Sequence, residues 1–205
     1  MPGRNLIKQY AAESYYHFYN RGVNKNRIFR DQEDFIVFLA LLKRYLGIKK
    51  VKKANRTNHP NFYNEVDLLA YCLMSNHFHL FIYQKEDPTA ITNFMRSLAT
   101  AYGMYFNKKY KRVGPVFQQR YRAVRITDDA QLLHISRYIH LNPDNYNTYE
   151  WSSLPYYLGN KTADWVKSNK ILELFDDVNY ADFVADYKAY HDDLNVIKQF
   201  IANTP

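Results

Sequence analysis

Cysteine is almost missing from this chain, and its scarcity excludes disulfide bonds within the chain before any motif is considered. The single cysteine, Cys72, cannot form an intramolecular disulfide, so the sequence fits a reducing compartment. The chain also lacks any run of about 18 apolar residues, which argues against a membrane-spanning helix. Its first eight residues contain no apolar segment of the kind that directs secretion. We therefore expect a cytoplasmic protein with no membrane partner.

Acidic side chains are outnumbered, and the excess of positive charge indicates a partner. A net charge of +8 and a pI near 9.3 favour a polyanion, most simply nucleic acid. Aromatic residues make up 17% of the chain and include 20 tyrosines. Aromatics interleaved with lysine and arginine suit unpaired bases, which need stacking surfaces as well as phosphate contacts. The alternative for the tyrosines is a tyrosine-rich core.

The spacing of apolar residues predicts elements in the order β-α-β-β-α-β-α. Asp31 and Asp128 are expected to cap two of the helices, and a third helix is expected to begin at Pro88. That order satisfies a ferredoxin-like (RRM-like) plait, an α+β fold with an antiparallel four-stranded sheet. The strands are expected at residues 15–22, 67–74, 77–83 and 121–126.

Outside the plait, the sequence predicts two further segments. Residues 10–145 would form the main domain, and residues 146–205 would form a C-terminal helical extension packed on it. The extension is expected to hold short helices within 164–175, 180–190 and 192–202. The long basic connection at 48–66 is either a solvated loop or a DNA-contacting one.

His77 and His79 are the most informative residues of the sequence. They lie two positions apart on a predicted strand, so both imidazoles project from the same face, while Phe78 and Leu80 project from the other. Two imidazoles on a rigid strand supply two ligands of a metal site. Taken alone, the pair is more often a packing or surface feature.

The last predicted helix of the plait supplies complementary groups. At about 100° per residue, Gln131, His134, Tyr138 and Asn142 fall along one side of this helix. Tyr138 and Asn142 are one turn apart and can address the same point. Pro143 disfavours helical geometry at Asn142, so that amide is expected at the helix end, free to turn toward a ligand.

Together these groups suit phosphodiester cleavage. A divalent metal on His77, His79 and one oxygen donor would polarise and orient a phosphate. A tyrosine hydroxyl in line could then attack phosphorus and form a covalent phosphotyrosine. The unperturbed pKa of tyrosine is about 10, so the hydroxyl needs a nearby metal, base or positive charge. His134 is a candidate helper in this role.

Four motifs in order resemble one known family. Ser75-Asn76-His77-Phe78-His79-Leu80 resembles the His-hydrophobic-His motif of single-tyrosine HUH transposases. Residues 15–22, 117–121 and 137–143 also match that family's pattern. The ending Tyr138-Ile139-His140-Leu141-Asn142-Pro143, with Trp151-Ser152-Ser153 downstream, is similar to the branch called REP-associated tyrosine transposases. These are bacterial proteins linked to repetitive extragenic palindromes, and the resemblance covers roughly residues 10–160.

The resemblance implies a DNA transposase and single-stranded DNA endonuclease that acts on hairpin DNA in the cytoplasm, in association with the nucleoid. It implies Mg²⁺ or Mn²⁺ bound by His77, His79 and Asn142, with Tyr138 forming a 5′-phosphotyrosine link. In insertion-sequence relatives the third ligand is commonly glutamine, where this chain has Asn142. Those relatives exchange the tyrosine helix in dimers, whereas the palindrome-associated branch favours a monomer with Tyr138 acting in its own chain.

Basic and aromatic residues around the fourth predicted strand are the candidates for DNA contact. Basic side chains can hold phosphates, which makes affinity fall with salt, and Tyr110 and Tyr121 could stack on bases. The full candidate set is Arg21, Lys108, Lys109, Lys111, Arg112, Arg120, Tyr121, Arg122 and Arg125.

Two alternatives stay open at this stage. One is a non-catalytic module on the same plait that binds single-stranded DNA or RNA, which would need basic and aromatic residues but no convergence of His77, His79 and Tyr138. The other is a domesticated protein that cleaves chromosomal palindromes without moving itself, which has the same chemistry and the same motifs.

Overall fold

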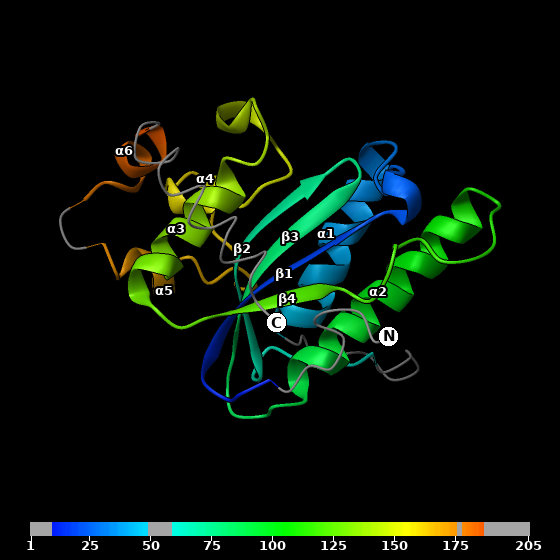
Figure 1. Ribbon diagram of the computed structural model, residues 1–205, viewed down its shortest axis with the longest axis horizontal. Helices are drawn as coiled ribbons and strands as arrows, with labels where there is room; N and C mark the ends of the chain where they lie inside the picture. Colours follow the sequence, from blue (N-terminus) through cyan, green and yellow to red (C-terminus); the bar gives the residue numbers. More distant parts are fainter. Residues whose placement is uncertain (1–9, 49–58, 176–177, 187–205) are drawn as a thin grey trace.

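A computed structural model describes residues 10–48, 59–175 and 178–186, and it contains the predicted plait (Figure 1). Its four antiparallel strands lie in the order β2-β3-β1-β4, which is the ferredoxin-like arrangement. The α+β fold class expected from the sequence is therefore confirmed. The strands are β1 (Ser14–Arg21), β2 (Val66–Met74), β3 (His77–Gln84) and β4 (Arg122–Ile126).

The two faces of the sheet are covered by different helices. Helices α1 (Gln32–Leu46) and α2 (Ala90–Lys109) pack together against one face, where Phe18, Phe78 and Leu80 are buried. Helix α3 (Asp129–His140) packs on the opposite face, over β2 and β3 (Figure 1). Strand β2 is buried on both faces, as its continuous apolar run predicts. The sheet is thus enclosed over β2 and β3, the two strands that α3 covers.

Helix starts follow the predicted caps at two of three positions. The carboxylate of Asp31 accepts a hydrogen bond from the Asp34 backbone, and Asp128 does the same for Gln131. The prediction that a helix begins at Pro88 is wrong by two residues. There the Asp87 side chain accepts hydrogen bonds from the backbone and hydroxyl of Thr89, which forms a turn before α2 begins.

The described part of the extension packs on α3. It consists of the 3-10 turn η2 (Tyr146–Thr148) and the short helices α4 (Leu154–Tyr157), α5 (Asn169–Leu172) and α6 (Tyr180–Ala185). The helices in 164–175 and 180–190 are shorter than expected, and the one in 192–202 lies outside the described residues. Most of the 48–66 connection also lies outside them. No helix among the described residues is long and apolar enough to cross a membrane.

Candidate active site

The two histidines of β3 and the asparagine after α3 converge on one point. His77 and His79 project from the face that α3 covers, with ring centroids 5.1 Å apart. The Asn142 side chain lies between them, with Oδ1 3.1 Å from Nε2 of His77 and Nδ2 3.4 Å from Nε2 of His79. The three predicted ligands therefore come from two segments 63 residues or more apart and point their donor atoms at a shared space.

The Asn76 side chain holds the outer nitrogen of His77. Its amide nitrogen donates to the carbonyl of Lys25 at 3.3 Å, so its Oδ1 faces Nδ1 of His77 at 2.6 Å and accepts from it. The neutral His77 ring then carries its proton on Nδ1 and presents the lone pair of Nε2 to Asn142. A partner on the outer nitrogen is the arrangement that orients metal-binding imidazoles in proteins.

His17 plays the corresponding part for His79, and the sequence reasoning did not single it out as a site residue. Nε2 of His17 lies 2.9 Å from Nδ1 of His79, and the two rings are stacked at 14°. Both rings are buried, so water does not compete for this contact. His17 lies on β1 two residues before Tyr19, which pairs with His79. The alternation His17-Tyr19 was visible in the sequence, but the pairing partner was not.

The donor set fits a divalent metal. Since Asn76 engages the proton of His77, the lone pair of Nε2 faces the lone pairs of Asn142 Oδ1 at 3.1 Å, a contact that a cation between them would make favourable. Among the described residues no group of three His, Cys, Asp or Glu side chains gathers, so the third donor is the neutral amide oxygen of Asn142. Two imidazoles and an amide leave open positions for a phosphate.

Burial keeps these imidazoles in the neutral form that metal binding needs. It lowers the pKa of His77, an effect that the nearby charge of Arg21 reinforces and that Asn142 opposes, because its oxygen can accept a hydrogen bond from the protonated ring. Burial also lowers the pKa of His79 well below its usual value, and the neighbouring His17 and His77 add to that shift. Protons therefore compete with a metal only in acidic solution.

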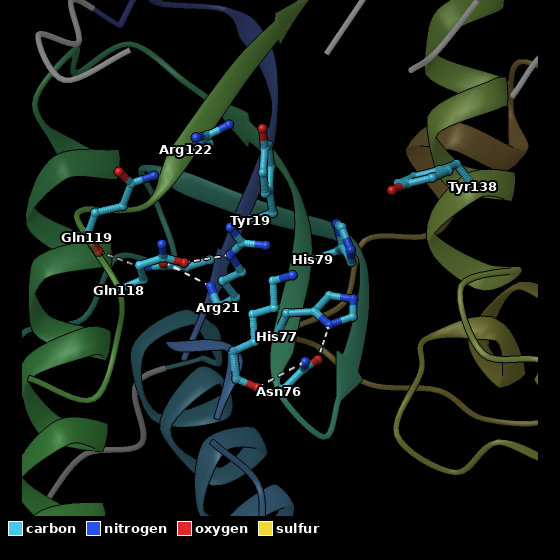
Figure 2. Close-up of a pocket in the computed structure, with 11 residues that line it drawn as sticks. Tyr19, Arg21, Asn76, His77, His79, Gln118, Gln119, Arg122 and Tyr138 are labelled. Atoms are coloured by element: carbon cyan, nitrogen blue, oxygen red, sulfur yellow. Dashed lines mark hydrogen bonds between the residues drawn. The ribbon is translucent and has the colours of Figure 1, made fainter. Parts of the chain in front are cut away.

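Tyr138 stands across from the histidine pair on α3. Its ring makes edge contacts with His79 at 5.5 Å and with His17 at 5.9 Å between centroids, and its hydroxyl points toward the pair (Figure 2). Burial raises the pKa of the Tyr138 hydroxyl, and Tyr19 raises it further, while a hydrogen bond with Asn142 lowers it. This hydroxyl requires a neighbouring positive charge to become a nucleophile near neutral pH.

His134, the candidate helper, is not among the groups brought to this point. Its ring packs on Phe183 of α6 at 6.1 Å, and its Nδ1 lies 3.2 Å from a guanidinium nitrogen of Arg137. His134 lies one helical turn before Tyr138 on α3, on the surface that α6 covers. We leave His134 out of the candidate catalytic groups.

Helix α3 is fixed in place by the extension of its own chain. The buried His140 ring contacts the Tyr180 hydroxyl at 2.6 Å and the Ser153 hydroxyl at 2.7 Å. The buried Arg137 guanidinium donates to the Phe183 carbonyl and lies over that residue's ring. These contacts tie α3 to the segments on both sides of α5 and so set where Tyr138 stands.

Two of the candidate DNA-binding residues lie beside the histidines. Arg21 and Arg122 line a cavity of about 460 Å³ that also reaches His77, His79 and Tyr138 (Figure 2). Both arginines are exposed, so they are accessible to a polyanion. Lys25, Gln118 and Gln119 line the same cavity and were not predicted as DNA contacts.

The remaining candidates are placed elsewhere. The Lys109 ammonium forms ion pairs with Asp31, Glu33 and Asp34 at 2.7–3.0 Å, so its charge is balanced by carboxylates of the same chain. Arg112 lies over the Phe106 ring. Tyr121 is half-buried and packs on Phe18 at the other face of the sheet. Arg125 alternates to that same face, while Lys108, Lys111 and Arg120 are exposed and are not among the residues that line the cavity.

Two solved structures are similar to this chain. A solved structure of a REP-associated tyrosine transposase bound to a REP hairpin matches with a TM-score of 0.55 at 13% identity, covering 80% of this chain and 92% of that one. A crystal structure described as a transposase from Deinococcus radiodurans R1 matches with a TM-score of 0.42 at 16% identity, covering 65% and 93%. No curated protein matches the chain.

The first of these structures shows that the fold of this protein is one used by tyrosine transposases. The family profile for transposases of the IS200-like type matches residues 11–142, which include the histidine strand, the tyrosine helix and Asn142. The chain belongs to the IS200-like transposase family.

Replacing His17 with alanine is expected to weaken metal binding while leaving both β3 imidazoles in place. The change removes the partner of His79 Nδ1 and frees that ring to rotate. Loss of such an outer partner costs about 10–100-fold in metal affinity in other proteins. Titration of Mn²⁺ into the apoprotein, followed by calorimetry, measures the change. Unaltered affinity in a folded His17→Ala protein would contradict the assignment, and His17→Gln, which keeps a hydrogen-bonding group, should recover part of the loss.

The metal-free protein is expected to lose stability as the pH falls below about 6.5. Burial lowers the pKa of His17 and of His140 to about 3, so the unfolded chain binds protons that the folded chain refuses. Each such histidine makes the free energy of unfolding fall by about 1.4 kcal/mol per pH unit between its unfolded and folded pKa values. Urea unfolding in the presence of chelator at a series of pH values tests this. A flat profile between pH 6 and pH 4 would be inconsistent with buried neutral histidines.

Proposed function

We propose that this protein is a metal-dependent endonuclease and strand transferase for single-stranded DNA that acts through Tyr138. One observation carries the proposal. The Asn142 side chain lies 3.1 Å from Nε2 of His77 through its Oδ1 and 3.4 Å from Nε2 of His79 through its Nδ2, while the Tyr138 ring stands against His79. A binding module with no chemistry to perform would not require this convergence.

Different residues of the site have different roles in the proposed reaction. His77, His79 and Asn142 would hold Mg²⁺ or Mn²⁺, which when bound supplies Lewis-acid polarisation of the scissile phosphate. Asn76 and His17 orient the two imidazoles. The Tyr138 oxygen forms a bond to phosphorus and gives its proton to water, and the bond from phosphorus to the 3′ oxygen breaks. The 3′ oxygen leaves with the electron pair and takes a proton from water, which yields a 5′-phosphotyrosine and a free 3′-hydroxyl.

Strand transfer follows from the same groups. A 3′-hydroxyl from another DNA end attacks the phosphotyrosine, and the Tyr138 oxygen becomes the leaving group and recovers a proton. Since a phosphotyrosine bond keeps the energy of the broken phosphodiester, the joining step needs no external energy source. The site therefore supports cleavage and rejoining by one residue.

The proposed substrate is single-stranded DNA next to a hairpin. The positive charge of the chain, with Arg21 and Arg122 exposed at the cavity, suits a phosphate backbone. A structural relative is a transposase bound to a REP hairpin, which makes hairpin DNA the first substrate to test.

We further propose that Tyr138 acts in its own chain and that the protein works as a monomer. Residues 10–145 would form the catalytic domain, and residues 146–205 would form an accessory element that positions the tyrosine helix. The contacts of His140 with Tyr180 and Ser153, and of Arg137 with Phe183, support this role. Exchange of α3 between two chains would have to break these buried contacts.

A covalent-trapping assay tests the proposed function. Labelled DNA with a hairpin and single-stranded flanks is incubated with the protein and Mg²⁺, Mn²⁺ or Zn²⁺, and the products are separated under denaturing conditions. We expect a metal-dependent band in which the protein is joined to the new 5′ end that cleavage creates. If no such band forms with any pool of flanking sequences, while the DNA is still bound, the non-catalytic binding module becomes the better account.

A further inference from the structure

A pair of arginines lies at the end of α2, outside the active site. Arg30 precedes α1, Arg112 follows α2, and neither lines the cavity beside the histidines. The guanidinium carbon of Arg30 lies 4.4 Å from the centre of the Tyr110 ring and 5.1 Å from that of the Phe106 ring. The guanidinium carbon of Arg112 lies 5.6 Å from the centre of the same Phe106 ring. Both guanidiniums are therefore held against the same group of aromatic side chains.

A buried carboxylate anchors the ring under Arg30. The Tyr110 hydroxyl donates a hydrogen bond to Oδ2 of Asp34 at 2.8 Å, and Asp34 is fully buried at the start of α1. Burial and this bond raise the pKa of the Tyr110 hydroxyl to about 12, so the hydroxyl remains a donor at neutral pH. Because the ring is anchored at its far end, Arg30 has a fixed surface on which to stack.

The turn after α2 holds Arg112. The Arg112 backbone amide donates to the Asn107 carbonyl at 3.0 Å, and one guanidinium nitrogen donates to the Pro115 carbonyl at 3.3 Å. The Asn107 side chain donates to the Gly114 carbonyl at 2.9 Å, and Gly114 has a φ of +95°, which favours glycine. A guanidinium has five N–H donors, so Arg112 keeps most of them for a ligand.

Both arginines keep an unbalanced charge. Among the residues that the structure describes, neither guanidinium forms an ion pair. The three carboxylates at the start of α1 pair with the adjacent Lys109 ammonium instead. Arg30 is exposed and Arg112 is half-buried, so an anion can reach both.

The distribution of charge along the chain favours the same side of the molecule. Residues 21–30 and 107–125 contain eleven basic side chains, four in the first segment and seven in the second, and no acidic one. Residues 126–186, which include α3 and part of the extension, contain ten acidic and four basic side chains. Figure 1 shows the end of α2 on the side of the molecule away from α5 and α6. DNA is therefore attracted to the end of α2 and repelled by the extension.

The form of DNA that suits this pair is the duplex. Single strands bind where bases can stack on accessible rings. Here Phe106 is buried and the Tyr110 ring carries Arg30 over its face, so the pair offers charge without a stacking surface. A duplex has paired bases and exposed phosphates, so it needs only the charge. We infer that Arg30 and Arg112 form a phosphate-binding site for the duplex stem of a DNA hairpin, separate from the active site.

The position of this site fits a hairpin that also reaches the histidines. Arg30 follows Lys25, which lines the cavity, by five residues, so their Cα atoms lie within about 18 Å of each other. One turn of duplex DNA is about 34 Å long, so one hairpin can place its stem on the arginines and its single-stranded flank near the histidines. The inference rests on the proposed function in taking hairpin DNA as the substrate, and it adds the surface that holds the stem.

Binding of two DNA probes to a double variant tests the site. The probes are a labelled hairpin with a single-stranded flank and an oligothymidylate of the same length. Any stem sequence serves, because phosphates carry no sequence information. Fluorescence anisotropy with chelator present, over a series of KCl concentrations, gives the affinities. Arg30→Gln/Arg112→Gln should bind the hairpin about tenfold more weakly, with a salt slope shallower by about two, and should bind oligothymidylate as the wild type does.

The matched control is Arg44→Gln/Arg96→Gln. Arg44 and Arg96 are exposed on α1 and α2, so this variant removes the same charge from the same pair of helices. It should leave the hairpin affinity near the wild-type value. Equal losses in the two double variants would show an effect of net charge alone and would overturn the inference. Equal losses for the hairpin and for oligothymidylate would overturn the assignment to a duplex.

A measurement on the unaltered protein covers the case of a variant that does not fold. Phenylglyoxal modifies accessible arginines, and mass spectrometry of the digested protein reports the extent at each one. The hairpin should slow modification of Arg30 and Arg112 several-fold, oligothymidylate should not, and Arg96 should react equally in every sample. Unchanged modification of both Arg30 and Arg112 under saturating hairpin would refute the site.

The stem site and the proposed function fail in different ways. If the wild-type protein forms the covalent adduct but the hairpin neither protects Arg30 and Arg112 nor loses affinity in their double variant, the stem site is wrong and the proposed function stands. If the hairpin is held by the two arginines but no adduct forms, the stem site stands and the Tyr138 chemistry is wrong.

Discussion

Substitution of Tyr138 by phenylalanine is expected to abolish the covalent adduct with DNA, while metal binding and DNA affinity stay near the wild-type values. The change removes one oxygen and keeps the ring that contacts His79 and His17. The fold around α3 should therefore persist, because the ring and the Arg137 and His140 contacts remain. The measurement is a denaturing gel of labelled hairpin DNA incubated with the variant and Mn²⁺.

Two tyrosine controls make this result specific. Tyr146→Phe alters a tyrosine on η2, outside the cavity lining, and should leave adduct formation unchanged. Tyr19→Phe alters the other tyrosine of the cavity, which pairs with His79 on the β1 side. An adduct that survives Tyr138→Phe and disappears with Tyr19→Phe would move the nucleophile to Tyr19 and refute the assignment.

Substitution of His79 by alanine is expected to remove metal-supported cleavage. The imidazole would supply one of the two nitrogen ligands of the proposed metal, and its loss also leaves the buried His17 Nε2 without its partner. Metal polarisation of a phosphate contributes several kcal/mol to such reactions, so cleavage should fall by about a thousandfold or more. His77→Ala should act in the same direction. Single-turnover cleavage rates over a series of Mn²⁺ concentrations measure the effect.

The control for the histidine variants is His59→Ala. His59 is exposed and is not among the residues that line the cavity, so its loss should change neither cleavage nor metal affinity. Circular dichroism separates loss of metal from loss of fold, and His79→Gln offers a variant that fills more of the buried space. Cleavage by folded His79→Ala with an unchanged metal requirement would rule His79 out as a ligand.

Local periodicity predicted the parts of the site that lie within one element. The i, i+2 spacing of His77 and His79 placed both rings on one face, and the one-turn spacing of Tyr138 and Asn142 placed their side chains on one side of α3. Caps at Asp31 and Asp128 were predictable because a carboxylate beside its own helix start needs no distant partner. In each case the deciding contacts are a few residues apart.

Charge and aromaticity alone were poor guides to which residues line the cavity. Lys109 and Tyr121 have suitable chemistry but find partners within the fold, Lys109 in the carboxylates of α1 and its cap, and Tyr121 in the ring of Phe18. Gln118 and Lys25, which were not predicted as DNA contacts, line the cavity instead. The difference arises because the burial and pairing of a side chain depend on segments that lie far from it in the sequence.

The sequence by itself determined the order of elements, the fold class and the identity of the two histidines, the tyrosine and the asparagine. Only the tertiary structure decided that Asn142 sits between the histidines and that His17 holds the outer nitrogen of His79. The physical reason is range. Helical and strand periodicity act over a few residues, whereas these contacts join positions 60 or more residues apart, whose proximity depends on how the whole sheet and α3 pack.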